Sequence, residues 1–215
     1  MGNSVKKGSI VHICRFVVPA LLLTGLAMRP MEVEAKPTRS TNIALTANEA
    51  VLVAVNTEAN SVTIFNVSGT TLTKRAEVPV GRNPRCVAIH SVRNEAFVTN
   101  AESGTVSVIS LTTDKVVATI GVAAEPRPCA LTPDGSILYV GNYSAGLVRA
   151  INPATRAIVN TISVGGNPGA IAINDSSPAR VFVTRFFARL RPGGPGEGFD
   201  DGKQGVVASF AVNAP

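Results

Sequence analysis

Two short segments, Phe97-Val98-Thr99-Asn100 and Tyr139-Val140-Gly141-Asn142, begin 42 residues apart and share a β-rich pattern that ends in asparagine. The pattern also begins 44 residues upstream as Val53-Ala54-Val55-Asn56 and 43 residues downstream as Phe182-Val183-Thr184-Arg185. A period of this length that recurs along a chain is typical of folds assembled from similar units. The chain is therefore expected to be a repeat protein.

Each unit contains three further short apolar runs in a fixed order. One run follows the asparagine segment, as at residues 105–109, and the next ends in a glycine–proline connection, as at residues 120–126. Another run, such as residues 129–132, opens the following unit. Gly, Pro, Asn and Asp separate the runs, and no stretch keeps a helical period between capping residues. These features predict four β-strands per unit and no helix.

Four strands in a unit of this length are typical of a β-propeller blade. We predict an all-β fold, a β-propeller of four-stranded antiparallel blades, with about four blades present and the last one incomplete. The predicted units span about residues 43–80, 86–122, 129–164 and 170–212. The last unit ends after its third strand, so 15 strands are expected. A truncated larger propeller is favoured over a closed four-bladed ring, and completion by a second chain is the third possibility.

The repeats resemble those of the YVTN-type β-propeller proteins. The resemblance rests on the two segments quoted first, on the strands at residues 105–111 and 117–120, and on the turn Pro133-Asp134-Gly135. It covers residues 43–212 and implies surface, adhesion or periplasmic binding roles. Similar propellers also include lactonases and the heavy chains of periplasmic dehydrogenases. Because a repeat describes a scaffold, the resemblance implies a fold more strongly than an activity.

The N-terminal 35 residues have the pattern of a cleaved export signal. Lys6 and Lys7 precede an apolar run at residues 16–28, and Val33-Glu34-Ala35 offers short side chains before a cut at Lys36. An uncleaved membrane anchor is the alternative, but a spanning helix needs about 20 apolar residues. We predict a signal peptide over residues 1–35, a mature chain over residues 36–215 without a transmembrane span, and a periplasmic or secreted location.

The composition excludes several kinds of site. The formal net charge of +6 permits an anionic partner without indicating nucleic acid. Two histidines and three cysteines are too few for a zinc cage or a cysteine scaffold. The chain has no haem-attachment motif and no Gly-x-Ser-x-Gly elbow, and Gly165-Gly166-Asn167-Pro168 joins two strands rather than opening a helix. No catalytic residue, metal or cofactor is therefore predicted.

The candidate ligand-binding residues are arginines on one face of the expected propeller. Within a blade, the turns between the second and third strands lie on the same face as the crossings into the next blade. This face is expected to gather Arg82, Arg85, Arg127, Arg185, Arg189 and Arg191. Arginine presents a planar fork that suits carboxylate or phosphate groups. The alternative is a set of solvated turn arginines that pair with nearby acids.

The fourth unit carries an insertion between Arg185 and Gly205, where the other units make a short turn. Its glycine and proline content predicts a long loop without regular structure, and long loops on rigid scaffolds often carry recognition. Glu197, Asp200 and Asp201 within it form a candidate cation site. These acids lack the alternating spacing of a calcium loop.

Cys86 and Cys129 occupy the same position on the first strands of adjacent units. An oxidising compartment would permit a disulfide between them. Innermost strands of adjacent blades are not hydrogen-bonded, however, and this can place their Cα atoms beyond the roughly 7 Å that a disulfide spans. Two small buried side chains are therefore favoured over a bond.

Two functions follow from these observations. The leading interpretation is an exported, non-enzymatic propeller that binds an unknown protein or a small anionic ligand through its loop face. Nucleic acid is not favoured as a partner, and self-association through the open edge is expected. The alternative is a propeller enzyme that resembles lactonases or the heavy chain of a periplasmic dehydrogenase, or a truncated remnant of one.

Overall fold

The computed structural model describes residues 38–196, 198 and 200–212. The predicted signal peptide lies outside the described residues, so both the signal and its cleavage stay predictions. Within the described ranges, no helix has the length and apolar character needed to cross a bilayer.

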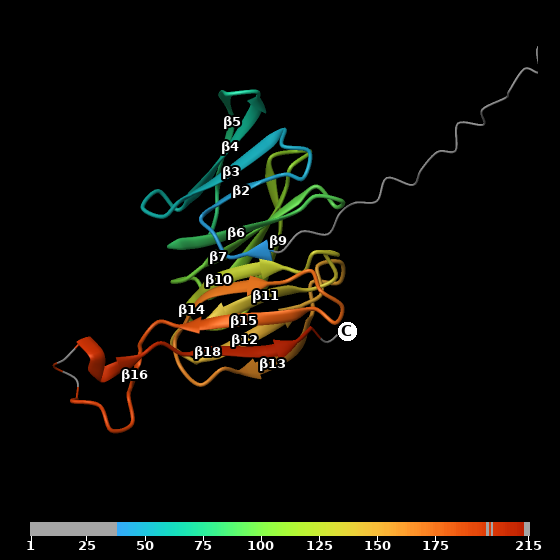
Figure 1. Ribbon diagram of the computed structural model, residues 1–215. Helices are drawn as coiled ribbons and strands as arrows, with labels where there is room; N and C mark the ends of the chain where they lie inside the picture. The colour runs from blue at the N-terminus through green and yellow to red at the C-terminus, as the bar shows by residue number, and fades with distance from the viewer. Residues whose placement is uncertain (1–37, 197, 199, 213–215) are drawn as a thin grey trace, which may run out of the picture. The chain divides into compact units, whose positions relative to one another are not determined.

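Four antiparallel sheets of four strands follow one another along the chain, and we call them blades 1 to 4 (Figure 1). Blade 1 contains β2 (Ile43–Leu45), β3 (Val51–Asn56), β4 (Ser61–Ser68) and β5 (Thr71–Pro79). Blade 2 contains β6 (Pro84–His90), β7 (Glu95–Asn100), β8 (Thr105–Ser110) and β9 (Lys115–Gly121). Blade 3 contains β10 (Pro126–Leu131), β11 (Leu138–Asn142), β12 (Leu147–Ile151) and β13 (Ile158–Ser163). The predicted all-β fold of about four propeller blades is confirmed.

Blades 2 and 3 bury both faces of their sheets, because each of them packs against a neighbouring blade on either side. In β8, Val106 and Val108 pack toward blade 3, while Ile109 packs toward blade 1. In β11, Val140 faces blade 2 and Tyr139 faces blade 4. This two-sided burial explains why these strands read as nearly continuous apolar runs.

Blade 4 differs from the prediction at its inner side. It contains β14 (Pro168–Ile173), β15 (Arg180–Arg185) and β18 (Val207–Ala211), and no described strand lies outside β18, as expected. Its fourth strand is β1 (Thr38–Arg39), which pairs with β14. The unit at residues 170–212 thus supplies three strands to this sheet, as predicted, and the N-terminal end of the described chain adds a fourth strand that the sequence did not predict.

Residues 38–42, which we call the axial segment, are bonded to all four blades. The Thr38 hydroxyl donates to the Leu131 carbonyl in blade 3, and Ser40 N–H donates to the Ile171 carbonyl in blade 4 at 2.8 Å. The Thr41 carbonyl accepts from Val87 N–H in blade 2, and the Asn42 carbonyl accepts from Val55 N–H in blade 1, both at 2.9 Å. The axial segment thus links the first strands of blades 2, 3 and 4 to β3 of blade 1.

The insertion contains regular structure, contrary to the expectation of an irregular loop. Strands β16 (Arg189–Leu190) and β17 (Lys203–Gln204) pair antiparallel, and the short helix η1 (Asp200–Gly202) precedes β17. Figure 1 shows this hairpin projecting beyond the ends of β15 and β18. The hairpin forms because the two ends of the insertion leave blade 4 side by side, at the paired ends of β15 and β18.

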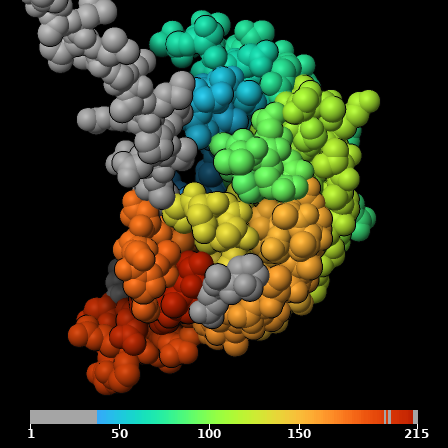
Figure 2. Space-filling view, turned by 90° about the vertical axis from the view of Figure 1, so that its right-hand side faces the viewer, coloured from blue at the N-terminus to red at the C-terminus, as the bar shows by residue number. Residues whose placement is uncertain are grey.

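The blades follow an arc, and their inner strands lie together. In Figure 2 the colours pass from blue through green and yellow to red along this arc. Strand β10 contacts both β6 and β14, so the first strands of blades 2, 3 and 4 are neighbours. The turns and crossings share one face as predicted, because Ala101 and Glu102 in a turn donate to the carbonyls of Asn83 and Arg82 in a crossing.

Candidate functional site

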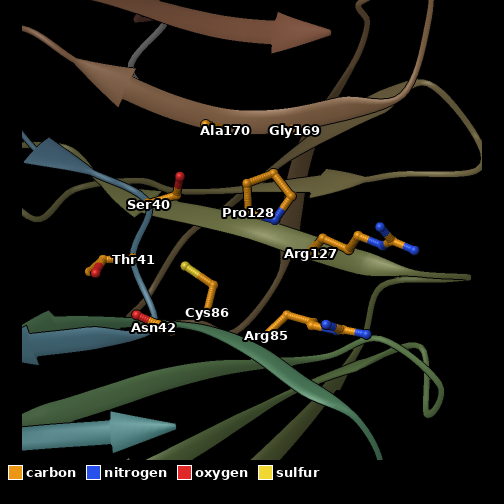
Figure 3. Close-up of a pocket in the computed structure, with 9 residues that line it drawn as sticks. All are labelled: Ser40, Thr41, Asn42, Arg85, Cys86, Arg127, Pro128, Gly169 and Ala170. Atoms are coloured by element: carbon orange, nitrogen blue, oxygen red, sulfur yellow. The ribbon is translucent and has the colours of Figure 1, made fainter. Parts of the chain in front are cut away.

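A pocket of about 360 Å³ lies where the inner strands meet the axial segment (Figure 3). The axial segment contributes one side, and the first strands of blades 2, 3 and 4 contribute the rest. Its lining residues are Ser40, Thr41, Asn42, Arg85, Cys86, Arg127, Pro128, Gly169 and Ala170. The pocket therefore draws on segments that are far apart in the sequence.

Each of these inner strands carries a β-bulge at the pocket. The bulges follow Pro84 in β6, Pro126 in β10 and Pro168 in β14, at equivalent points of the three blades. Arg85 and Arg127 lie within two of these bulges. A bulge leaves an extra residue outside the regular ladder and re-aims its side chain. The repeat thus places two arginines side by side at the pocket.

Arg127 is held in place by its neighbours. Its guanidinium carbon lies 3.7 Å from the centroid of the Tyr143 ring, and its Nη2 donates to Glu125 Oε1 at 3.0 Å. Its backbone carbonyl accepts from the Thr99 hydroxyl at 2.8 Å. Its Nε is buried and makes no hydrogen bond to any described residue. A cation stacked on an aromatic face and paired with an acid is oriented before a ligand arrives.

Arg85 is exposed, and no hydrogen bond or ion pair joins its side chain to another described residue. Figure 3 shows the Arg85 and Arg127 side chains extending in the same direction from neighbouring strands. Of these two arginines, only Arg127 has an acidic partner among the described residues, namely Glu125. The pair therefore leaves positive charge at the pocket, which favours an anionic ligand.

Aromatic rings connect this pocket to the start of the insertion. The Phe186 ring centroid lies 5.6 Å from that of Tyr143 and 5.0 Å from that of Phe187, both edge to face. Phe186 and Phe187 are 63% and 61% exposed. Tyr143 was not among the residues predicted from the sequence, although its position directly after the repeat asparagine placed it on the arginine-bearing face.

The other predicted arginines lie outside the pocket lining. The Arg185 side chain covers the crossing from blade 3 to blade 4 and lies directly over Gly166. A Cβ atom added to Gly166 would lie 2.1 Å from Arg185 Nε. Arg82 is exposed in the crossing before β6. Arg189 lies in β16 and Arg191 follows it, both exposed. The structure therefore brings two of the six predicted arginines together at the pocket.

The acidic candidates add no metal site in the part of the chain that the structure describes. Asp201 is exposed in η1, and Glu197 lies outside the described residues, so the candidate cation site of Glu197, Asp200 and Asp201 stays a prediction. No group of three or more His, Cys, Asp or Glu side chains within the described ranges could hold a metal ion. His90 ends β6 at the strand end opposite Arg85, and burial together with Arg93 lowers its pKa.

Cys86 and Cys129 are in direct contact between the inner strands of blades 2 and 3. Their sulfur atoms are 2.7 Å apart, and both side chains are buried as free thiols. Cys129 N–H donates to Cys86 Sγ at 3.1 Å. The two thiols meet because the inner strands β6 and β10 of blades 2 and 3 pack against each other.

Comparison with known proteins identifies the scaffold. Residues 23–124 match the family model described as lactonase, 7-bladed β-propeller. Hydrazine synthase from Kuenenia stuttgartiensis superposes with a TM-score of 0.56 at 23% identity, over 66% of this chain and 45% of that one. A candidate 6-phosphogluconolactonase from Bacteroides fragilis superposes with a TM-score of 0.54 at 13% identity, over 63% of this chain and 42% of that one.

No curated protein matches the chain. The chain spans less than half the length of the two solved structures described above. At these identities the two structures share a fold with this chain, and the family-model match points to the same architecture. Sheet topology and comparisons agree that this chain is a β-propeller protein.

Proposed function

We propose that this chain is a lactonase-like propeller protein. In this proposal, the pocket beside the axial segment binds the anionic group of a sugar-acid lactone or of its hydrolysis product. One observation carries the proposal: Arg85 and Arg127 occupy equivalent bulges on adjacent inner strands and line the same pocket. The comparisons favour this alternative over a non-enzymatic binding module, since they match a lactonase model and a candidate 6-phosphogluconolactonase.

The chemistry of the pocket fits a phosphorylated or carboxylated sugar. Its volume of about 360 Å³ is in the range of small-ligand sites. A guanidinium fork binds phosphate or carboxylate through two parallel hydrogen bonds, and the axial segment adds the polar residues Ser40, Thr41 and Asn42. The proposal assigns substrate binding to this pocket, and assigns the hydrolytic step to none of the described residues.

The two arginines have different roles in this proposal. Arg127 is oriented by Tyr143 and Glu125, so its fork would meet an anion with little reorganisation. Arg85 has no described partner and would close on the anion when it binds. Phe186 lies against Tyr143, and the insertion would therefore border the bound ligand. The exported location predicted from the N-terminus is part of the proposal.

Calorimetric titration of the purified chain with 6-phosphogluconate tests the proposal. Replacing Arg127 by Gln should weaken binding by about 10- to 100-fold, since a hydrogen bond to a charged group contributes about 1.5–3 kcal/mol. Added salt should also weaken binding. Arg82→Gln is the matched control, because Arg82 is exposed on the same face and does not line the pocket. Equal losses in the two variants would contradict a pocket site.

Two further measurements separate binding from catalysis and from the insertion. Hydrolysis of a sugar δ-lactone above its spontaneous rate would support the enzyme assignment, whereas binding of the phosphorylated acid without hydrolysis would restrict the chain to a binding role. Replacing residues 186–204 by a four-residue turn should keep the blades folded, because β15 and β18 still pair. It should weaken anion binding, because Tyr143 loses Phe186.

A further inference from the structure

We propose that Cys86 and Cys129 are an oxidative modification site and form a disulfide that joins the inner strands of blades 2 and 3. The two residues lie on β6 and β10, 43 positions apart. Their sulfur atoms are 2.7 Å apart, which is closer than two sulfur atoms without a bond normally approach. Only a small movement separates this arrangement from a covalent bond.

The backbone fixes the two thiols in this position. Cys129 N–H donates to Cys86 Sγ at 3.1 Å, and the Cys86 thiol lies 3.2 Å from the Cys129 carbonyl oxygen, to which it donates. The exposed fractions are 2% for Cys86 and 0% for Cys129.

A shared metal ion does not fit this geometry. Each thiolate binds zinc at about 2.3 Å, so two sulfurs on opposite sides of an ion would be about 4.6 Å apart. A smaller separation would require further ligands around the ion. Within residues 38–196, 198 and 200–212, no third His, Cys, Asp or Glu joins the two cysteines. The geometry therefore points to a bond between the sulfurs.

The pocket gives an oxidant access to one of the two thiols. Cys86 lines the pocket and appears at its wall in Figure 3, whereas Cys129 is fully buried. Burial raises the pKa of the Cys129 thiol well above its ordinary value. Because Cys86 lines the pocket and Cys129 does not, Cys86 is the first to react.

The proposed reaction is thiol–disulfide exchange with a small disulfide such as oxidised glutathione. The Cys86 thiol loses its proton, and its sulfur attacks one sulfur of the reagent. The reagent's S–S bond breaks, and one reduced thiol leaves with the electron pair. Cys129 then loses its proton and attacks the Cys86 sulfur of the mixed disulfide, which releases the second thiol. Two protein thiols are oxidised, and one reagent disulfide is reduced to two thiols.

The bond would stiffen the wall of the pocket. Arg85 immediately precedes Cys86, and Arg127 precedes Cys129 by two positions, so the bond would fix the two bulged strands that carry the arginines. A cross-link that closes a loop of this length restricts the unfolded chain. It should raise the melting temperature by roughly 10 °C.

The full chain, which contains three cysteines, is treated with oxidised or reduced glutathione, then denatured and alkylated. The proposal expects Cys86 and Cys129 to carry neither the alkylating group nor glutathione after oxidation, and all three cysteines to be alkylated after reduction, with peptide mapping that joins Cys86 to Cys129. The melting temperature should rise on oxidation in the unmodified chain and in Cys14→Ala, and it should not change in Cys86→Ala. The comparison of the two treatments requires no variant to fold.

Three alkylated cysteines after oxidation would overturn the proposal, and so would a bond that joins Cys14 to either partner. A Cys86–Cys129 bond without a change in melting temperature would refute the expected stabilisation by the cross-link. None of these readouts depends on anion binding, so the proposed function can fail while the disulfide is confirmed.

Discussion

Asn142 donates hydrogen bonds to the carbonyls of Val122, Ala123 and Ala124 at 2.8, 3.2 and 2.9 Å. These carbonyls belong to the crossing between blades 2 and 3, so the side chain fixes the entry into its own blade. Asn100 acts within its blade and donates to the hydroxyls of Thr105 and Ser107. The repeated asparagine thus stabilises the scaffold, which explains why it recurs once per blade in the first three.

Replacing Asn142 by Ala should lower the free energy of unfolding by about 2–3 kcal/mol, because buried carbonyls lose their donor. Denaturant unfolding followed by circular dichroism measures the loss. Asn160→Ala is the control, since Asn160 is exposed on β13, and its effect should stay within about 0.5 kcal/mol. Similar losses in the two variants would contradict a scaffold role for Asn142.

At the scale of strands and turns, ion pairs join blade 1 to blade 2 and blade 2 to blade 3. Arg75 in β5 donates to the Asp114 carboxylate at 2.6 and 2.9 Å, which ties blade 1 to the outer turn of blade 2. Glu95 in β7 accepts from Arg156 in the outer turn of blade 3, and also from Arg93 at 2.9 Å. Burial alone would raise the pKa of Glu95, but the hydrogen bonds from the two arginines outweigh it and lower the pKa below 4.5.

This pKa shift predicts an acid-sensitive contact between blades 2 and 3. A carboxyl whose pKa is lowered by folding contributes stability above its unfolded pKa of 4.5, and the contribution is lost as the pH falls through the folded value. Glu95→Gln should cost about 1–3 kcal/mol near neutral pH, and the cost should shrink as the pH falls well below 4.5.

Denaturant unfolding at neutral and acidic pH checks this expectation. Glu58→Gln is the matched control, since Glu58 is exposed and forms no ion pair with a described residue. A stability difference for Glu95→Gln that stays constant across the acidic range would show that the carboxylate charge does not hold the two blades together.

The sequence predicted the elements that repeat and missed those that occur once. The four units were found because apolar runs separated by turn residues recur at a fixed period. Strand β1 has only two residues, and Thr38 within it pairs with Ile173, which lies 135 positions away. No local sequence pattern therefore indicated this strand. The bulges that aim Arg85 and Arg127 into one pocket depend on strand register, which sequence spacing alone does not specify.

At the scale of the whole described chain, the two terminal blades each expose an apolar face. In blade 1, Ile43 and Leu45 are 48% and 43% exposed, whereas Ala44 between them packs toward blade 2. In blade 4, Phe182 and Val207 are 37% and 59% exposed, whereas Val181 and Val183 are fully buried against blade 3. Side chains alternate along a strand, so each terminal sheet presents one packed face and one open face.

These open faces predict self-association. We expect the purified chain to form dimers or larger assemblies, because apolar sheet faces and unpaired edges bind one another. The double variant Phe182→Ser and Val207→Ser should shift the chain toward monomer in light scattering. Val159→Ser is the control, since Val159 is exposed on the outer strand β13 rather than on a terminal face. An unmodified chain that stays monomeric at high concentration would contradict the prediction.

The axial segment has a consequence for the order of folding. Each blade forms from neighbouring residues, so blades 1 to 3 can assemble as synthesis proceeds from the N-terminus. Residues 38–40, by contrast, find their partners at residues 171–173 only after blade 4 has emerged. This contact closes a chain of more than a hundred residues, which makes it entropically slow. The first residues of the described chain are therefore the last to reach their place, and the pocket they line is completed in the same late step.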